Sequence, residues 1–202
     1  MAAVSFDVFC GEIENAEYES EKLLIDREIL KRLQIEKGSE LTLDEIKDLV
    51  FVSQCYRAKN KAVWYLSQSD LSKKALYDKL LRTYSQKASA FAVEQMLKKG
   101  YLNDERYAEN LAHRLFSQNV SVKAAVGKML AKGVDLDLAK KAVAEYKDDN
   151  YLSAYRLLIT KYKNKLSNED DVRRTVQALL RRGFSYTDVK SALEKVKSSA
   201  DE

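Results

Sequence analysis

Basic side chains recur in this chain at a spacing of fifty residues, and such side chains bind anions. Lys73, Lys123 and Arg173 each stand a few residues before an apolar stripe of helical period, so the spacing predicts that each lies in the first turn of a helix. A cation there opposes the helix dipole, at a cost of about a few tenths of a kcal/mol. Because helix N-termini also bind phosphate and carboxylate groups, we interpret these residues as contacts to an anionic partner. Placement on solvated helix faces is the alternative.

Residues that could carry out catalysis are few. His113 is the single histidine, and it falls in the middle of a predicted helix without neighbours at a metal-binding spacing. Cys10 and Cys55 are the two cysteines, and they show no metal-binding spacing either. The sequence contains no glycine-rich phosphate loop, nucleophile elbow or zinc-protease motif. We therefore expect a binding protein rather than an enzyme, with no metal and no cofactor.

The elements that would position the basic residues repeat with the same period. When residue n is placed beside n+50 and n+100 without gaps, apolar positions match in three copies: Leu76 with Val126 and Val176, and Leu80 with Leu130 and Leu180. Each stripe is followed by a basic residue, then by Thr83, Gly133 or Gly183, and soon by a residue that caps helices well. The pattern predicts two helices joined by a tight turn in every copy.

Each copy is predicted to contain three helices. The first gives 55–67, 72–82 and 86–99, the second 104–117, 121–132 and 136–147, and the third 151–163, 169–182 and 186–197. Proline, which breaks helices, does not occur in the sequence. The expected fold is all-α, with three tandem three-helix repeats in an elongated, curved array. The expected domains are an acidic N-terminal module, 1–50, and repeats at 51–100, 101–150 and 151–202.

The first fifty residues are less regular than the repeats. A short strand and a hairpin turn are indicated by Val4, Phe6, Val8 and Gly11. Apolar residues within 26–33 predict a helix that ends near Lys37 and Gly38. Thr42 and Glu45 have the spacing of a capping box, so another helix is expected to begin there and to run toward the first repeat.

The net charge of +4 conceals an asymmetry along the chain. Residues 1–50 hold 6 Lys and Arg against 13 Asp and Glu, a net of −7, whereas residues 51–202 hold 29 against 18, a net of +11. The basic part indicates a polyanion, or the acidic face of a nucleic-acid-bound protein, as the partner. No apolar run is long enough to cross a bilayer and no export signal is apparent, so we expect a cytoplasmic protein without membrane contact.

The segment from Gly100 to Ala108 connects the first two repeats. Asn103 is suited to cap the following helix, and Asp104 and Glu105 are suited to its first turn, so a structural role explains most of the segment. Arg106 either pairs with an acidic residue or faces a partner. Packing in core or half-buried positions, rather than stacking on nucleic-acid bases, is expected for Trp64, Tyr65, Tyr101, Tyr107, Tyr155 and Tyr162.

The connector resembles the strongest signature of the RecX family of bacterial regulators of the RecA recombinase: Gly100-Tyr101-Leu102-Asn103-Asp104-Glu105-Arg106-Tyr107-Ala108. A later stretch is similar to the C-terminal signature of that family: Leu179-Leu180-Arg181-Arg182-Gly183-Phe184-Ser185-Tyr186, with Val189. Two further stretches also fit: Lys132-Gly133-Val134, and the series Ala62, Leu66, Ser72, Leu76, Lys79 and Leu80. The resemblance covers about residues 26–202.

This resemblance implies both a fold and a partner. Proteins of the RecX family consist of three tandem three-helix units and bind the RecA filament on single-stranded DNA, within the helical groove of the filament. They limit the ATPase, strand-exchange and co-protease activities of RecA, which damps homologous recombination, DNA repair and the SOS response. We expect this chain to act on the RecA filament as a monomer, with a weak direct contact to DNA as a further interaction.

The chain departs from the family pattern mainly in its first two repeats. Family members carry a glycine and consecutive basic residues, an arginine-rich turn and a further glycine where this chain has Ser121-Val122-Lys123-Ala124-Ala125, Ser67-Gln68-Ser69-Asp70 and Thr83. The third repeat retains the most charge, so we expect the main electrostatic contact there. The predicted contact residues for the RecA–DNA filament are Lys73, Arg106, Lys123, Arg173, Arg174, Arg181 and Arg182.

Two alternatives to RecA regulation stay open. The net charge of +11 over residues 51–202 is also typical of a direct DNA-binding helical module. A helical adaptor for some other protein is the third hypothesis.

Overall fold

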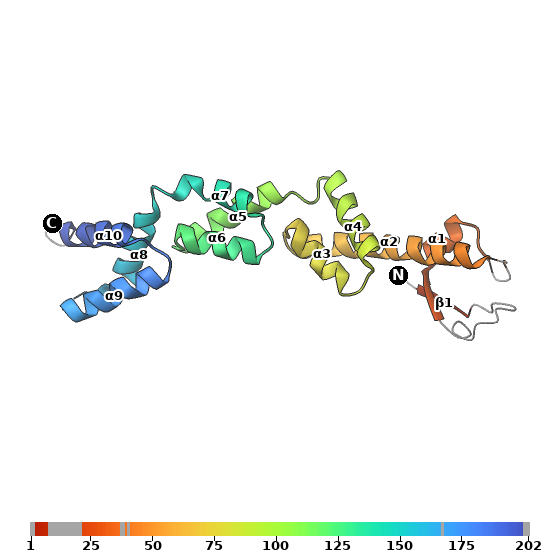
Figure 1. The fold of residues 1–202 in the computed structure, drawn as a ribbon, viewed down its shortest axis with the longest axis horizontal. Helices are drawn as coiled ribbons and strands as arrows, with labels where there is room; N and C mark the ends of the chain where they lie inside the picture. The colour runs from red at the N-terminus through yellow and green to blue at the C-terminus, as the bar shows by residue number, and fades with distance from the viewer. Residues whose placement is uncertain (1–2, 8–21, 37–38, 40, 167, 200–202) are drawn as a thin grey trace. The chain divides into compact units, whose positions relative to one another are not determined.

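The computed structural model describes residues 3–7, 22–36, 39, 41–166 and 168–199. Over these residues the chain is helical apart from one two-stranded hairpin (Figure 1), so the expected all-α class is confirmed. The elements are β1 Ala3–Asp7, β2 Lys22–Asp26, α1 Arg27–Arg32, α2 Leu43–Gln68, α3 Lys73–Leu81, α4 Gln86–Lys98, α5 Asp104–Ser117, α6 Val122–Ala131, α7 Leu136–Ala142, α8 Asn150–Thr160, α9 Glu169–Arg181 and α10 Tyr186–Ser198, with 3₁₀ turns η2 Ala144–Tyr146 and η3 Lys163–Lys165.

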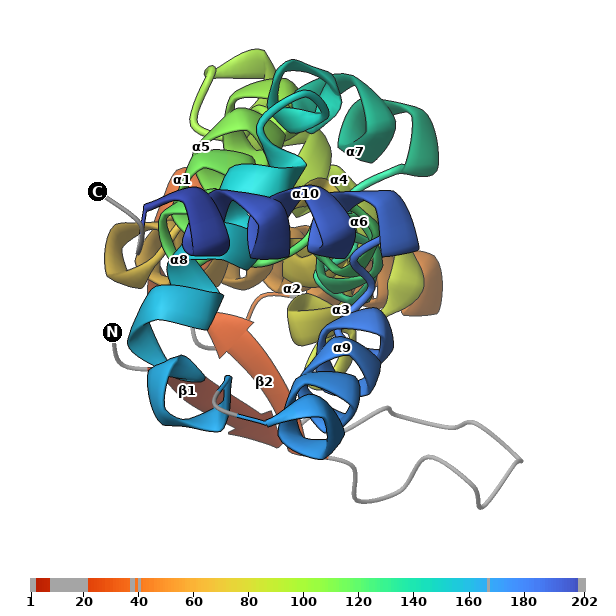
Figure 2. The ribbon, with the colours of Figure 1, turned by 90° about the vertical axis from the view of Figure 1, so that its left-hand side faces the viewer.

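The N-terminal segment forms the predicted strand and pairs it. β1 and β2 are antiparallel, with Val4 opposite Ile25, and Figure 2 shows the two strands side by side. Of the other residues in these predictions, Val8, Gly11, Lys37 and Gly38 lie outside the described residues. The predicted helix over 26–33 is α1, whose first turn is capped by the Asp26 carboxylate through the backbone N–H of Glu28.

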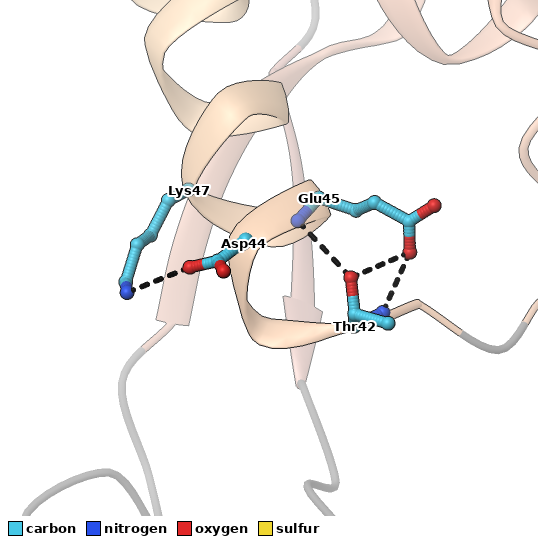
Figure 3. A network of polar contacts seen from close by, with 4 residues as sticks. All are labelled: Thr42, Asp44, Glu45 and Lys47. Atoms are coloured by element: carbon cyan, nitrogen blue, oxygen red, sulfur yellow. Dashed lines mark hydrogen bonds and ion pairs between the residues drawn. The ribbon is translucent and has the colours of Figure 1, made fainter.

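The capping box predicted at Thr42 starts the longest helix among the described residues, α2. Thr42 Oγ1 accepts from the backbone N–H of Glu45 at 3.3 Å, and Glu45 Oε2 accepts from the backbone N–H of Thr42 at 2.8 Å (Figure 3). Lys47 pairs with Asp44 at 3.0 Å beside this box. The backbone N–H and the side-chain hydroxyl of Thr42 both donate to the Glu45 carboxylate, and these two hydrogen bonds lower the pKa of Glu45.

The later helices lie where the sequence predicts them, with small differences at their ends. The helix predicted over 136–147 ends early as α7 and continues as the 3₁₀ turn η2, and the helix predicted over 151–163 is the shorter α8 followed by η3. Elsewhere the predicted bounds differ from the observed ones by a residue or two, except that the helix predicted over 55–67 is the C-terminal half of α2.

The described chain divides into two compact units, residues 1–70 with 74–102 and residues 71–73 with 103–202. In the first unit α2 packs along α4, and fully buried small residues at the contact, Ala58, Ala62 and Ala92, permit a close approach of the two helices. A separate cluster of Ile25, Ile29, Leu30 and Leu49 covers the base of the hairpin and α1.

The second unit contains two hydrophobic clusters. One is built from α5, α6 and α7 around Leu111, Met129 and Val143. The other is built from α8, α9 and α10 around Leu158 and Leu179, and Figure 2 shows α10 lying across α8. The division of the chain into four domains stays a prediction.

Burial corrects the gapless fifty-residue alignment in the middle helices. Leu130, which the alignment equates with Leu80, is 43% exposed, whereas its neighbour Met129 is fully buried. The buried pairs are Leu76 and Leu80 in α3, Ala125 and Met129 in α6, and Thr175 and Leu179 in α9. The first spacing is therefore 49 residues and the second 50.

A shorter turn after α3 explains this one-residue shift. The N–H of Val134 reaches back five residues to the carbonyl of Met129, and Phe184 does the same with Leu179, across glycines at φ +80° and +90°. Tyr84 reaches back only four residues, to Leu80, and the turn before it contains Thr83 in place of a glycine.

The gapless alignment also fails for α5 and α8, by four residues. Ala108 and Ala112 of α5 are buried, and the corresponding buried residues of α8 are Ala154 and Leu158, a spacing of 46. The missing four residues reappear between α8 and α9, where the chain forms η3. The gapless fifty-residue alignment, which places Ala108 beside Leu158, is therefore wrong for these helices.

Candidate partner-binding surface

The start of α6 makes a set of contacts that we call the Ser121 joint, formed by Ser121, Val122, Asn150 and Arg182. Ser121 Oγ donates to the carbonyl oxygen of Arg182 at 2.7 Å, and it also accepts from the N–H of Ala124. The N–H of Val122 donates to Asn150 Oδ1 at 3.1 Å. The start of α6 is therefore bonded to Arg182, the C-cap residue of α9, and to Asn150, the first residue of α8.

The same arrangement occurs 49 residues earlier, in a Ser72 joint formed by Ser72, Lys73, Asp104 and Lys132. Ser72 Oγ donates to the carbonyl oxygen of Lys132 at 2.7 Å, and the N–H of Lys73 donates to Asp104 Oδ1 at 2.7 Å. All four residues belong to the second unit. In both joints a serine bonds to the C-cap carbonyl of a basic residue that ends the next middle helix.

Glycine is required at the Ser121 joint for two reasons. Gly183 has φ +90°, a conformation that L side chains rarely adopt. A Cβ at this position would lie 2.8 Å from Ser121 Oγ and 3.4 Å from Lys123 Cβ. The turn after α9 therefore packs directly against the start of α6, and Lys123 lies beside it.

These joints change how Lys73 and Lys123 are understood. The sequence suggested that helix N-termini themselves bind an anion, but the first N–H of α3 donates to Asp104 and that of α6 donates to Asn150. An anion at either place would therefore be held by the lysine side chains, which are both exposed, and not by the helix N-terminus.

Arg173 does not lie in a first turn, contrary to the prediction. α9 begins at Glu169, where the sequence predicts it, and Asn168 caps it by accepting from the N–H of Asp171 at 2.8 Å, so Arg173 lies in the second turn. The first turn of α9 holds three acidic residues, which suit the helix dipole: Glu169, Asp170 and Asp171. In the corrected alignment the equivalents of Arg173 are Lys123 and Lys74, not Lys73.

Three predicted contact residues share the outer face of α9, and we call them the α9 arginines: Arg173, Arg174 and Arg181. All three are exposed, while Thr175 and Leu179 bury the opposite face. Arg174 Nη1 lies 3.6 Å from Asp171 Oδ1 in an exposed pair, which is a weak interaction. The face is therefore open to a partner.

Arg182 has a structural role as well as an exposed side chain. Its carbonyl oxygen closes the Ser121 joint, and its guanidinium carbon lies 5.9 Å from the centre of the Tyr162 ring. The carbonyl role belongs to the backbone, so it does not depend on the side chain. The joint brings Arg182 and Lys123 together from two different middle helices.

The connector has the structural role that its sequence indicates. Gly100 has φ +69° and ends α4, and Asn103 caps α5 by accepting from the N–H of Arg106 at 3.0 Å. Glu105 forms an ion pair with Lys141, which lowers the pKa of Glu105 and raises the pKa of Lys141. Arg106 is exposed and takes part in none of the ion pairs found among the described residues, so it is open to a partner.

Two aromatic residues are not packed as predicted. As expected, Tyr107 is buried in the cluster of α5, α6 and α7, and Tyr162 is buried in the cluster of α8, α9 and α10. Tyr101, however, is 56% exposed, and Trp64 is 50% exposed. Helical spacing alone could not show this, because the neighbouring alanines of α2 fill the helix contact that Trp64 was expected to fill.

A shallow cleft of about 580 Å³ beside α5 and α7 is lined in part by Glu105, His113, Lys141 and Tyr146. His113 is exposed there, which agrees with its interpretation as a helix surface residue. Among residues 3–7, 22–36, 39, 41–166 and 168–199, no His, Cys, Asp and Glu side chains cluster as metal ligands do. Within the same ranges no helix is long and apolar enough to span a membrane.

Relatives of the chain can now be set beside this geometry. No protein-family model matches the chain. Regulatory protein RecX from Caldanaerobacter subterraneus is 28% identical over 83% of this chain and 85% of the relative. Regulatory protein RecX from Listeria monocytogenes is 26% identical over 88% and 68%, and that from Streptococcus sanguinis is 25% identical over 91% and 72%.

Solved structures agree in fold. The crystal structure of RecX from Lactobacillus salivarius superposes with a TM-score of 0.64, covering 72% of this chain and 98% of that one at 22% identity. A second crystal structure of regulatory protein RecX gives 0.69, with 87% and 89% covered at 15% identity. The chain resembles RecX proteins in sequence over most of its length, and it shares their fold. The RecX resemblance seen in the connector and in the turn after α9 is thereby confirmed.

The sequence did not reveal the buried polar residues of the two joints. Ser72, Ser121 and Asn150 are buried and bonded across 28 to 61 positions of sequence. A signal was present, because Ser72 and Ser121 are 49 residues apart, the spacing of the buried residues Leu80 and Met129. The fifty-residue alignment concealed it.

Proposed function

We propose that this chain regulates RecA by binding the RecA–DNA filament and mainly inhibiting its ATPase, strand-exchange and co-protease activities. The similarity to RecX proteins, which are named regulatory proteins, supports the proposal. The observation that carries it is the recurrence of exposed cations around each joint serine: Lys73 and Lys74 follow Ser72, which is bonded to the carbonyl of Lys132, and Lys123 follows Ser121, which is bonded to the carbonyl of Arg182. Repeated cations suit a repeated anionic partner, such as DNA held in a filament.

The contact residues that we propose are the seven exposed cations predicted from the sequence. They are Lys73, Arg106, Lys123, Arg173, Arg174, Arg181 and Arg182. The α9 arginines and Arg182 contribute most, because arginine binds phosphate and carboxylate groups with a fixed pair of donors. Cytoplasmic action as a monomer, in the regulation of recombination, repair and the SOS response, follows from the same proposal.

The test is the single-strand-dependent ATPase of RecA, measured with increasing amounts of this protein. We expect inhibition by the wild type and at least about tenfold weaker inhibition when Arg173, Arg174, Arg181 and Arg182 are all alanine. A matched control removes four other exposed cations: Lys87, Lys99, Lys140 and Lys147. The control has the same net charge, so it separates a located contact from general electrostatic attraction.

Circular dichroism accompanies this assay to confirm that both variants keep their helices. No inhibition by the wild type in excess over RecA contradicts the proposed function. Equal inhibition by the two variants contradicts the assignment of the contact to the third repeat.

Direct DNA binding is the second candidate function, and α6 favours it. The helix and its C-cap carry Lys123, Lys128 and Lys132 without an acidic residue. If this is the main activity, the protein binds DNA without RecA, with an affinity that falls steeply as salt concentration rises. Binding only in the presence of RecA contradicts it.

A further inference from the structure

A compact group of aromatic and cationic side chains lies on α2 and α3, within the first unit, and we call it the Trp64 cluster: Lys61, Trp64, Tyr65 and Lys79. Lys61 Nζ lies 3.8 Å from the centre of the Trp64 ring and 5.1 Å from that of Tyr65. Lys79 Nζ, from α3, also lies 5.1 Å from the Tyr65 ring. The two rings are 5.2 Å apart.

Trp64 is exposed to a degree that folding alone does not explain. A tryptophan side chain contributes a large apolar area when buried, yet half of this residue faces solvent. It also stands on the last two turns of a 26-residue helix, so its position is fixed by a regular element rather than by a loop. Rigid, exposed aromatic rings are typical of binding surfaces.

Along the C-terminal part of α2 the charge is of one sign, and the nearest acidic residues in sequence are Asp70, after the helix, and Asp78, beside Lys79 in α3. Residues 49–69 contain Arg57, Lys59 and Lys61 and no aspartate or glutamate. Neither Lys61 nor Lys79 forms an ion pair with any residue that the structure describes. Two ammonium groups held near one ring without a carboxylate repel each other, and a bound anion would relieve that repulsion.

We propose that the Trp64 cluster is a binding site for single-stranded nucleic acid. An unpaired base stacks on the exposed indole of Trp64, while Lys61 and Lys79 neutralise the flanking phosphates. Only a ligand that combines a flat ring with repeated negative charge satisfies both halves of the cluster. A duplex fits less well, because its bases are already stacked on one another and present no free face. The proposal does not rest on RecA regulation, and its test contains no RecA.

Trp64 is the only tryptophan of the chain, so its fluorescence reports on this site alone. The full-length protein is titrated with oligothymidylate of about 16 nucleotides and, separately, with duplex DNA of equal length. We expect the single strand to quench the Trp64 emission and the duplex to leave it nearly unchanged. Absence of quenching, or equal quenching by the duplex, overturns the proposal.

Binding of a labelled oligothymidylate to variants separates stacking from other contacts. Trp64→Leu keeps an apolar side chain but cannot stack, and we expect affinity to fall about fivefold or more. Lys61→Gln and Lys79→Gln should each reduce the slope of log affinity against log salt by about 0.7. Tyr101→Ala, which removes another exposed aromatic residue of the same unit, is the matched control and should bind like the wild type.

Unchanged affinity of Trp64→Leu overturns the proposal, as does an equal loss in Tyr101→Ala. Loss of RecA inhibition in Trp64→Leu with intact binding to oligothymidylate also overturns it and makes the cluster a protein contact. Failure to inhibit RecA at all, with normal quenching of Trp64 by the single strand, instead contradicts the proposed function and supports this site.

Discussion

The helices α6 and α9 begin in opposite ways, although their buried residues, Ala125 with Met129 and Thr175 with Leu179, align at a spacing of 50. α6 begins at Ser121 with Lys123 in its first turn and no acidic residue there. α9 begins at Asn168 and carries Glu169, Asp170 and Asp171 in its first turn. Both N-cap side chains accept from their own helix, but Ser121 is buried and its hydroxyl is also bonded to the C-cap carbonyl of Arg182, whereas Asn168 is exposed.

This difference shows what determines charge at a helix start. A free N-terminus such as that of α9 is stabilised by carboxylates. At the start of α6 the carbonyl end of α9 supplies the negative partial charge instead, and Lys123 stands beside that carbonyl end. A cation that opposes its own helix dipole is thus favoured by the dipole of its neighbour.

Among the variants that test this difference, Gly183→Ala is expected to cause the largest loss of stability. The added Cβ forces a left-handed conformation on alanine and lies against Ser121 Oγ, so we expect the free energy of unfolding to fall by about 2–4 kcal/mol. Gly100→Ala is the control, because Gly100 also has a positive φ but no atom within 4 Å of the added Cβ, and about 1–2 kcal/mol is expected. Urea unfolding measures both, and equal losses would show that the joint contributes nothing.

Charge substitutions in the first turns of α6 and α9 compare the two helix starts directly, with smaller effects on stability. The helix dipole alone predicts that Lys123→Glu stabilises α6 by about 0.3–1 kcal/mol. Because the carbonyl end of α9 is adjacent, we expect no gain or a small loss. Glu169→Lys, at the free start of α9, should lose about 0.3–1 kcal/mol. A gain in Lys123→Glu as large as the loss in Glu169→Lys would contradict the account of the joint given above.

The smallest effect concerns the exposed ion pair of Glu105 and Lys141. Because the pair lowers the pKa of Glu105, its contribution to stability is present above the ordinary glutamate pKa of about 4.3 and is lost as the pH falls through the lowered pKa. In Glu105→Gln the melting temperature should therefore fall less between neutral and acid pH than it does in the wild type. Asp78→Asn, exposed and outside the ion pairs of the described residues, is the control. Identical pH profiles for the wild type and Glu105→Gln would count against this contribution.

Much of the fold could be predicted because its signals are local. The capping box at Thr42 and Glu45, the glycines after α6 and α9, and the apolar stripes of the helices all act within a few residues. The alignment failed where two apolar residues are adjacent. Met129 and Leu130 are equally hydrophobic in sequence, and only packing shows that Met129 is buried and Leu130 is not.

The candidate surface was harder to predict, because it depends on contacts between distant residues. The hydrogen bond from Ser121 to Arg182 spans 61 positions of sequence, and no local pattern predicts it. Trp64 was expected to pack, since nothing in its helical spacing shows that Ala58 and Ala62 bury that part of α2. The seven basic residues could be predicted from the sequence as exposed cations on helices, and their role in binding stays a prediction.

The acceptors at the two joints, Asp104 and Asn150, differ by a single atom, and the difference follows from their surroundings. Each accepts from the first N–H of a middle helix, but Asn150 also donates its Nδ2 to Asp188 Oδ2 at 2.6 Å, within the capping box of α10. Asn150→Asp would keep the acceptor and set two carboxylates against each other. The residue type at 150 is thus coupled to that at 188, so the two positions are expected to vary together rather than independently.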